Sequence, residues 1–175
     1  MTIEKGIEKG VSEIGVRVNS LLPRRHSLCM NRKFTLTPLP DPVFAWPIRV
    51  YWEDTDAGGV VYHARYLHFL ERARSEWLRA SGIGQQQLRD DLGIVFVVHR
   101  MELAFNAPAR LDDLLRATVL PIERRSASFT VNQELRREPD SKALVQARVR
   151  IACIDASRFR PRPIPDHLFQ EMAKT

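Results

Sequence analysis

Cysteine is scarce in this sequence, and long apolar runs are missing. The 175 residues include two cysteines, Cys29 and Cys153, which form neither a metal-ligand spacing nor a redox pair. So few cysteines exclude a disulfide framework and favour a reducing compartment. No stretch approaches the roughly 18 consecutive apolar residues of a membrane span, and the first residues lack the apolar core of a secretory signal. We therefore expect a cytoplasmic protein without a transmembrane segment.

Positive charge is present, but it is not distributed as in a nucleic-acid-binding protein. The formal net charge is +6. Residues 1–40 hold seven Lys and Arg against three Glu, whereas residues 41–175 hold 20 Lys and Arg against 18 Asp and Glu. The basic excess therefore belongs mostly to the leading segment. Because no basic patch is interleaved with aromatic or helix-borne contacts, we expect no nucleic-acid partner.

The first forty residues have the pattern of an extension. They show no long amphipathic period and lead into the proline-rich "TPLPDP", which keeps the backbone extended and marks a boundary. We predict a disordered extension over residues 1–40, one domain over 41–168 and a C-terminal tail over 169–175. With 44% apolar residues, the chain can bury a core of ordinary size.

The periodicity of the remaining sequence predicts an α+β fold. "FAWPIRVYWE" (44–53) is typical of a strand, and apolar residues at helical spacing predict a long helix over 64–81, ended by Gly82. "QQQLRDDL" is expected to form a short helix. Alternating apolar residues and short polar connections predict four further strands, over 94–105, 114–123, 126–137 and 142–155. We expect a five-stranded antiparallel sheet curled around one long helix, with exposed edges that favour edge-to-edge dimerisation.

The segment between the first strand and the long helix, "EDTDAGGVVYH", carries the candidate chemistry. Its Gly58 and Gly59 allow positive φ and the close approach of a ligand. The start of the helix offers unpaired N–H groups and a partial positive charge. Such groups stabilise a developing oxyanion, while a carboxylate such as Asp56 attacks the carbonyl or deprotonates a water. The alternative is that Asp56 is a solvated turn residue or a helix cap.

The type of bond that such a site could cleave follows from what the sequence lacks. No serine has the G-x-S-x-G setting, and no cysteine lies near a base, so a nucleophilic triad has no support. A carboxylate alone is poorly suited to amides, whose amine leaving group needs a proton. A thiol, with a pKa of about 8.5, leaves as thiolate without a strong acid. A lone aspartate at an oxyanion site therefore favours thioester hydrolysis.

The segment "VYWEDTDAGGVVYHARYLHFLERARSEWLR" (50–79) resembles the 4-hydroxybenzoyl-CoA thioesterase family, most closely its Tol-Pal-associated acyl-CoA thioesterase branch. "PARLDDLL" (108–115) and "DASRFRPRPIP" (155–165) carry the same resemblance, which spans about residues 46–168. The resemblance implies a hot-dog fold, assembly as a homodimer or homotetramer, and hydrolysis of acyl-CoA without a metal or organic cofactor. Acyl carrier protein and envelope-complex proteins are further candidate partners.

The resemblance also implies roles for individual residues. Asp56 matches the catalytic carboxylate, and the backbone N–H of His63 matches the group that polarises the thioester carbonyl. The imidazole of His63 orients substrate or water, or is simply a polar group at the helix start. The substrate-binding residues expected beside them are Gly59, Val60, Tyr62 and Arg65.

Two positions distinguish this chain within the resemblance. Arg65 stands where the family often has a small or amide residue, which affects contacts of the acyl pocket or loop. A neighbouring hot-dog branch places its catalytic carboxylate on the helix, where Glu71 is the candidate here. Because Glu71 falls on the polar face with Arg74 and Ser75 nearby, we expect a surface ion pair instead.

The phosphates of CoA need cationic partners, and arginine binds phosphate with two parallel hydrogen bonds. Arg124 and Arg125 lie in a predicted strand connection, and Arg158 follows the last strand. These three arginines are the candidate phosphate-binding residues, although most such arginines are solvated surface groups.

Two alternative functions use the same fold. A dehydratase acting on acyl thioesters would need a histidine and a second acid or base across the acyl chain, which the aspartate-first motif disfavours. A non-catalytic scaffold that binds acyl thioesters or envelope-complex proteins would need no carboxylate beside an oxyanion site. The sequence therefore favours an acyl-CoA thioesterase.

Overall fold

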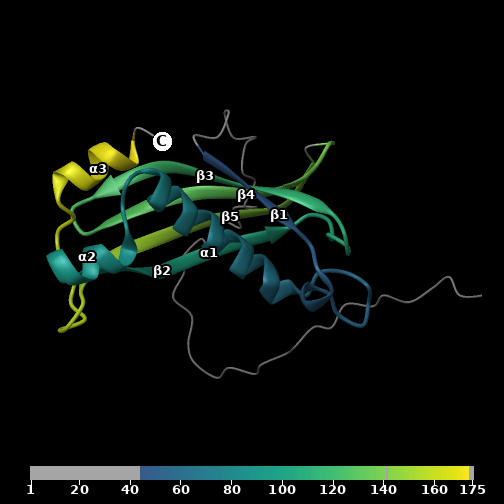
Figure 1. Cartoon of the computed structure of the whole chain (residues 1–175), viewed down its shortest axis with the longest axis horizontal. Helices are drawn as coiled ribbons and strands as arrows, with labels where there is room; N and C mark the ends of the chain where they lie inside the picture. Colours follow the sequence, from purple (N-terminus) through teal and green to yellow (C-terminus); the bar gives the residue numbers. More distant parts are fainter. Residues whose placement is uncertain (1–43, 141, 174–175) are drawn as a thin grey trace, which may run out of the picture. The chain divides into compact units, whose positions relative to one another are not determined.

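The computed structural model describes residues 44–140 and 142–173. Within these ranges a strand and a 3-10 turn lead into two helices, which are followed by four strands and a final helix (Figure 1). The bounds are β1 Phe44–Arg49, η1 Trp52–Asp54, α1 His63–Ala80, α2 Gln85–Leu92, β2 Ile94–Phe105, β3 Leu114–Arg125, β4 Ser128–Arg137, β5 Lys142–Asp155 and α3 Asp166–Met172. The predicted extension over residues 1–40 lies outside the described residues.

The five strands form one antiparallel sheet in the order β1-β3-β4-β5-β2, which leaves β1 and β2 at the edges. Helix α1 lies across one face of this sheet (Figure 1). The predicted fold, a five-stranded antiparallel sheet with one long helix, is confirmed. The register of β2 against β5 shifts between Val98 and Arg100, so His99 is an extra residue at a bulge in the edge strand.

Helix α1 buries one side along its whole length, as its sequence period predicts. The buried side chains that share this side are Tyr66, Phe69, Leu70, Ala73, Trp77 and Leu78. The ring of Trp77 packs near that of Phe129 on β4, with 6.0 Å between the ring centres. Gly82, at a φ of +75°, follows the helix in the left-handed conformation that a terminating glycine adopts at little cost.

One charged side chain lies inside this apolar contact. Arg74 is 6% exposed and donates to Oε1 of Gln133 on β4 at 2.6 Å, while it also pairs with Glu71. Gln133 is fully buried and donates from Nε2 to the carbonyl of Leu70 at 3.1 Å. Burial lowers the pKa of Arg74, and the negative charge of Glu71 opposes that change. These bonds let a buried cation join the helix to the sheet.

The first strand ends earlier than the sequence predicts. β1 stops at Arg49, and Trp52–Asp54 form a 3-10 turn in place of the end of the predicted strand over 44–53. The backbone N–H of Tyr51 donates to Oδ2 of Asp54 at 2.9 Å, and that of Asp54 donates to the carbonyl of Tyr51 at 3.0 Å. This local pairing competes with the strand ladder, which explains the early end.

A helix follows the last strand, and the strand pattern of the sequence did not reveal it. Helix α3 crosses the boundary that the sequence places after residue 168 and buries Leu168 and Met172. The ring of its Phe169 meets Phe129 edge-on at 6.3 Å between the centres. The packed part of the chain therefore continues to Met172, into the predicted tail.

The buried Arg74 provides a test of the helix-to-sheet contact. Replacing Gln133 with Leu removes the Oε1 acceptor and leaves a buried guanidinium with one fewer partner. We expect the free energy of unfolding to fall by about 1–3 kcal/mol, measured by urea denaturation at neutral pH. Gln86→Leu, on the exposed face of α2, is the control and should change stability little. Equal unfolding midpoints for the two variants would contradict the proposed importance of this contact.

Candidate active site

The glycine-containing turn is closed by its own backbone. The N–H of Asp56 donates to the carbonyl of Val60 at 2.9 Å, and the N–H of Gly59 donates to the carbonyl of Asp56 at 3.0 Å. Gly59 takes a φ of +70°, which a residue with a side chain rarely adopts. Residues 55 and 61 form a bridge on either side of the turn. The turn therefore presents Asp56 at a defined position.

Gly58, which precedes Gly59 in the turn, explains how the Asp56 carboxylate is held. The N–H of Gly58 donates to Oδ1 of Asp56 at 2.8 Å. A Cβ atom at Gly58 would stand 3.1 Å from that oxygen, closer than ordinary contacts. The other carboxylate oxygen is left for a ligand or water, since Asp56 is exposed. Gly58 thus permits a hydrogen-bonded but solvent-accessible carboxylate.

Asp54 lies two residues earlier and has a different environment. It is 4% exposed, its Oδ2 accepts the Tyr51 N–H, and its Oδ1 lies 2.9 Å from Nε of Arg65. Its backbone carbonyl accepts the N–H of Tyr62 at 2.9 Å. Asp54 therefore ties the 3-10 turn to the first turn of α1. Of the two aspartates, Asp54 is buried and paired, and Asp56 is the exposed one.

Arg65 was predicted to contact substrate, and the structure places its guanidinium on acidic groups of the turn. Nε pairs with Asp54, and Nη2 lies 3.3 Å from Oε1 of Glu53. The side chain of Arg65 is 28% exposed, so most of it is covered by the protein. These ion pairs give Arg65 a role in holding the turn against α1.

No side chain caps the first turn of α1. Tyr62 precedes the helix and supplies no side-chain cap. The N–H of Val61 donates to the carbonyl of Ala109 and that of Arg65 to the carbonyl of Tyr62, at 2.9 and 2.8 Å. His63, the first helical residue, is exposed, and its ring tilts against that of Tyr62 with 4.3 Å between the centres. An uncapped helix start of this kind attracts a developing negative charge.

A buried tyrosine links this helix start to the loop between β2 and β3. Tyr66 is 3% exposed, and its hydroxyl accepts the N–H of Ala109 at 2.8 Å. Burial raises the pKa of Tyr66, the Ala109 hydrogen bond lowers it, and the negative charges of Asp113 and Asp56 add to the rise.

The motif "PARLDDLL" supports the other side of the turn. Oδ2 of Asp113 accepts the N–H of Arg110 at 2.8 Å and pairs with Arg137 at 2.9 Å. Nη2 of Arg137 donates to the carbonyl of Pro108 at 2.7 Å. The sequence marked this motif as part of the resemblance but gave no role to Asp113 or Arg137. Their partners lie far apart in sequence, so only the fold brings them together.

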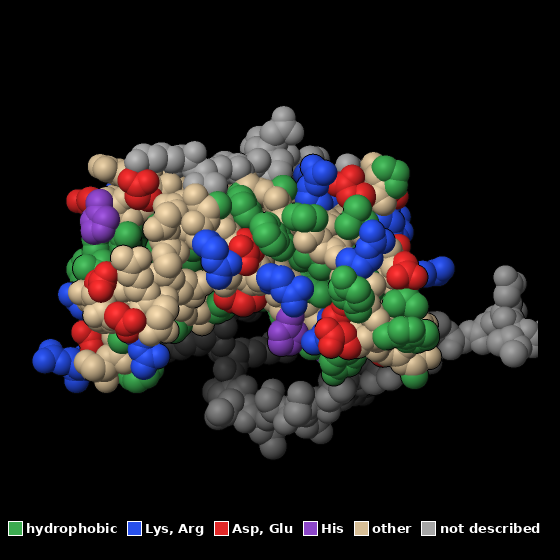
Figure 2. Space-filling view, in the orientation of Figure 1, with side chains coloured by type: hydrophobic (Ala, Val, Ile, Leu, Met, Phe, Trp, Pro, Cys, Tyr) green, Lys and Arg blue, Asp and Glu red, His purple; other side chains and the backbone are tan. Residues whose placement is uncertain are grey.

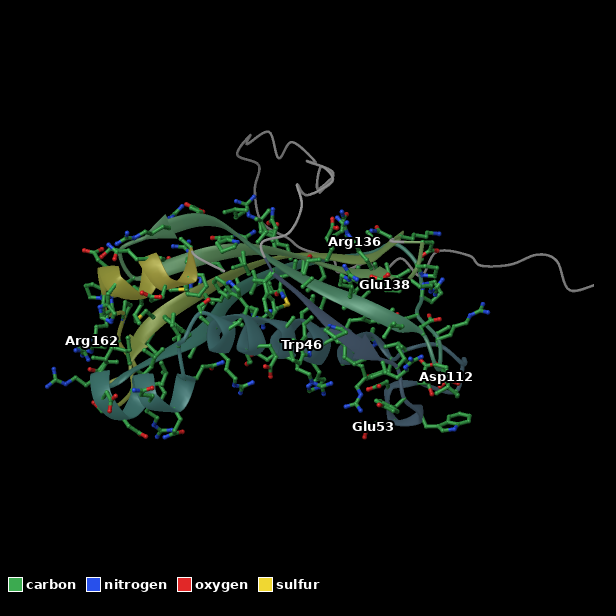
Figure 3. All side chains as sticks on the ribbon, turned by 45° about the horizontal axis from the view of Figure 1, so that its top comes forward. Trp46, Glu53, Asp112, Arg136, Glu138 and Arg162 are labelled. Atoms are coloured by element: carbon green, nitrogen blue, oxygen red, sulfur yellow. The ribbon has the colours of Figure 1, made fainter. Side chains whose placement is uncertain are left out.

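The three arginines predicted to bind phosphate lie away from this turn. Arg124 pairs with Asp166 and stands over the ring of Phe169 at 4.1 Å, while Nε of Arg125 lies 2.7 Å from Glu123. Arg158 is exposed and follows β5. In Figure 3, Glu53 and Asp112 lie at one end of the sheet and Arg162 at the opposite end. Within one subunit, these arginines do not converge on Asp56.

A cavity of about 420 Å³ lies at the same distant end. Its lining includes Trp77, Phe129 and Phe169, together with Arg124. None of its lining residues belongs to the turn that carries Asp56. The candidate chemistry therefore depends on the exposed turn and the helix start, and not on this apolar cavity.

Other site types find no support within residues 44–140 and 142–173. These ranges contain no group of three or more His, Cys, Asp and Glu side chains placed to hold a metal ion. None of their helices combines the length and apolar character needed to cross a membrane. Figure 2 shows acidic and basic side chains interspersed on the face in view, unlike a continuous basic patch.

The sequence and the fold are both similar to those of known proteins. Residues 50–172 match the thioesterase-like superfamily. The chain is 44% identical over 125 residues to the acyl-CoA thioesterase YbgC of Haemophilus influenzae, an alignment that covers 71% of this chain and 90% of that protein. The structure of a probable thioesterase from Bartonella henselae is 40% identical, with a TM-score of 0.65, covering 69% of this chain and 98% of that one.

A more distant structure shares the fold. A 4-hydroxybenzoyl CoA thioesterase mutant complexed with 4-hydroxybenzoyl CoA has a TM-score of 0.69 at 21% identity, covering 73% of this chain and 96% of that one. The superfamily match includes the Asp56 turn, α1 and all the strands that follow them. The predicted family is thereby confirmed: this chain belongs to the thioesterase-like superfamily, with the hot-dog fold.

Proposed function

We propose that this protein hydrolyses acyl-CoA thioesters to the free acid and CoA, with the Asp56 carboxylate as base or nucleophile. The relative at 44% identity carries the name acyl-CoA thioesterase. The observation that carries the proposal is the contrast between the two aspartates of the turn. Asp54 is buried and paired, whereas Asp56 is exposed and held by one N–H beside an uncapped helix start.

The oxyanion site in this proposal is the start of α1. The substrate carbonyl oxygen accepts the backbone N–H of His63, and the partial positive charge of the helix end stabilises the negative charge that develops there. Removing one such donor in other enzymes costs about 10²–10³ in kcat. The imidazole of His63 then orients substrate or water, and Gly59, Val60 and Tyr62 line the approach to the carbonyl.

Two routes are consistent with an exposed carboxylate. In the first, Asp56 takes a proton from water, the hydroxide adds to the carbonyl carbon, and the C–S bond breaks to release CoA thiolate. In the second, Asp56 attacks the carbonyl carbon, the thiolate leaves, and water hydrolyses the resulting mixed anhydride. Both give the same acid and CoA, and neither needs a strong general acid because the thiolate is a good leaving group.

We also propose that the protein acts as a cytoplasmic homodimer or homotetramer. β2 is an edge strand of 12 residues, and Val97 and Val98 in its middle are 37% and 47% exposed. A long edge strand with exposed β-branched residues is prone to pair with another strand. Pairing with a second copy satisfies its free backbone groups. Acyl carrier protein and envelope-complex proteins remain the proposed further partners.

The direct test is Asp56→Asn. The amide keeps the size of the side chain but removes its basicity and nucleophilicity, so we expect kcat to fall by at least ~10²-fold. Release of free thiol is measured over a panel of acyl-CoAs from short aliphatic to aromatic. If wild type cleaves none of them, or if Asp56→Asn matches wild type, a non-catalytic binding protein becomes the better explanation.

Asp54→Asn is the matched variant, two residues away in the same turn. It breaks the buried pair with Arg65, so we expect the free energy of unfolding to fall by about 1–3 kcal/mol in urea denaturation. Asp56→Asn should leave that free energy within about 0.5 kcal/mol of wild type, because its carboxylate is exposed. Equal losses of stability for the two variants would contradict the assignment of Asp54 as the structural aspartate.

A further inference from the structure

The cavity far from Asp56 has the size and the walls of a small-molecule site. It is bordered by α1, the β3–β4 hairpin and α3. Its volume of about 420 Å³ lies within the range of roughly 300–1,000 Å³ that is typical of pockets for small molecules. Its apolar lining includes Trp77, Pro121, Ile122, Phe129, Phe169 and Met172. The cavity therefore suits a molecule with an apolar body.

The indole of Trp77 has an unpaired donor. Trp77 is 1% exposed, and its Nε1–H has no hydrogen-bond acceptor within residues 44–140 and 142–173. A buried donor without an acceptor is costly, so such groups are rare in folded proteins. Trp77 also lines a cavity of about 70 Å³ beside Arg74, which is too small for most organic ligands. An oxygen of a ligand in the larger cavity would supply the missing acceptor.

A cation stands in the wall of the same cavity. The guanidinium of Arg124 lies 4.1 Å from the centre of the Phe169 ring and pairs with Asp166 on α3. The side chains of Arg124 and Asp166 are 53% and 81% exposed, and such exposed pairs contribute little to stability. A ligand carboxylate can therefore replace that of Asp166 at little cost. Arginine also binds carboxylates through two parallel hydrogen bonds.

Glu123 lines the cavity too, but its carboxylate already has partners. Oε1 lies 2.7 Å from Nε of Arg125, and Oε2 accepts the hydroxyl of Thr130 at 3.3 Å. These contacts balance the charge of Glu123 locally. Glu123 therefore does not compete with a ligand for Arg124.

A series of ring contacts joins the cation to the unpaired donor. Arg124 stands over the ring of Phe169, and that ring meets the ring of Phe129 with 6.3 Å between the centres. The ring of Phe129 in turn lies 6.0 Å from that of Trp77. A ligand that follows these rings meets a cation first, then apolar surface, then an N–H donor. The matching molecule carries a carboxylate, an apolar chain and a second oxygen.

We propose that this cavity binds a small carboxylic acid whose apolar chain carries a second oxygen, such as an ω-hydroxy acid. The carboxylate accepts hydrogen bonds from Arg124, and the chain packs on Phe129 and Phe169. The second oxygen accepts the N–H of Trp77. The site is separate from Asp56, and the inference does not rest on the proposed thioesterase function.

The first test is the affinity of the full chain for ω-hydroxyoctanoate, measured by isothermal titration calorimetry. Octanol lacks the carboxylate and octanoate lacks the second oxygen, so both should bind more weakly. Arg124→Gln should weaken the binding of ω-hydroxyoctanoate by about 10- to 150-fold, the range for one hydrogen bond to a charged group, and leave that of octanol unchanged. If wild type shows no saturable binding of ω-hydroxyoctanoate, or Arg124→Gln binds it equally well, the proposal is overturned.

The location of the site is tested on β3. Ile122 lines the cavity and is 40% exposed, so Ile122→Trp fills the cavity without replacing a buried side chain. Leu114→Trp is the matched control, since Leu114 begins the same strand and is 39% exposed. Binding of ω-hydroxyoctanoate should be lost in Ile122→Trp and kept in Leu114→Trp. Equal affinities for the two variants would place the acid elsewhere.

The role of the Trp77 N–H is visible by NMR. Its indole signal, identified by its loss in Trp77→Phe, should shift when ω-hydroxyoctanoate is added and shift less with octanoate. A signal that stays in place at saturation would overturn the role of this donor.

Asp56→Asn distinguishes the cavity from the candidate active site, because a carboxylic acid is also the product of the proposed hydrolysis. This variant should bind ω-hydroxyoctanoate with the affinity of wild type. If its affinity changes as much as that of Arg124→Gln, the acid binds at the Asp56 turn and the cavity is not its site. None of these measurements requires acyl-CoA hydrolysis, so their outcome is separate from that of the thioesterase proposal.

Discussion

The buried carboxylate of Asp54 is the constraint on which the candidate site depends. Its two oxygens contact the Tyr51 N–H and the Arg65 guanidinium, and the backbone carbonyl of Asp54 accepts the Tyr62 N–H. A buried carboxylate is tolerated only when such partners satisfy it. The 3-10 turn, the glycine turn and the first turn of α1 are therefore joined into one unit. The backbone of Asp56 is bonded within that unit, and its exposed carboxylate accepts one N–H from Gly58, which leaves the other carboxylate oxygen available for chemistry.

The support for this unit comes from the sheet and the loop before β3. Tyr66 reaches from α1 to the backbone of Ala109, and Arg137 reaches from β4 to Asp113 and Pro108. Ala109 in turn accepts the N–H of Val61 at 2.9 Å, at the end of the glycine turn. A helix start that must polarise a carbonyl requires such fixed surroundings, because a preorganised donor costs no reorganisation during the reaction.

The two ends of the subunit have different chemistry. One end holds the exposed Asp56 carboxylate and the uncapped start of α1. The other end holds the loop after β5, where Phe159 is 73% exposed, and the cavity lined by Trp77, Phe129 and Phe169.

The sequence by itself determined the elements whose cause is local. The helical period of α1, its terminating Gly82, the alternation in β2 to β5, and the glycine turn around Asp56 were all predicted, because each depends on neighbours a few residues away. The resemblance of residues 50–79 then indicated the family. These features were enough to select the fold and to identify Asp56 as the candidate carboxylate.

The pairing of Glu71 with Arg74 was predicted from their spacing, whereas the tertiary structure decided which charged residues from distant parts of the chain meet. Arg65 was expected at the substrate and lies on Asp54, and Arg74 is buried against Gln133. Of the arginines predicted to bind phosphate, Arg124 pairs with Asp166 on α3 and Arg125 with Glu123. Helix α3 was hidden because its seven residues are too few for a clear period, and it is held by buried Leu168 and Met172. Partners of a charge or of a short helix lie far apart in sequence, so their contacts follow from the folded chain and not from local pattern.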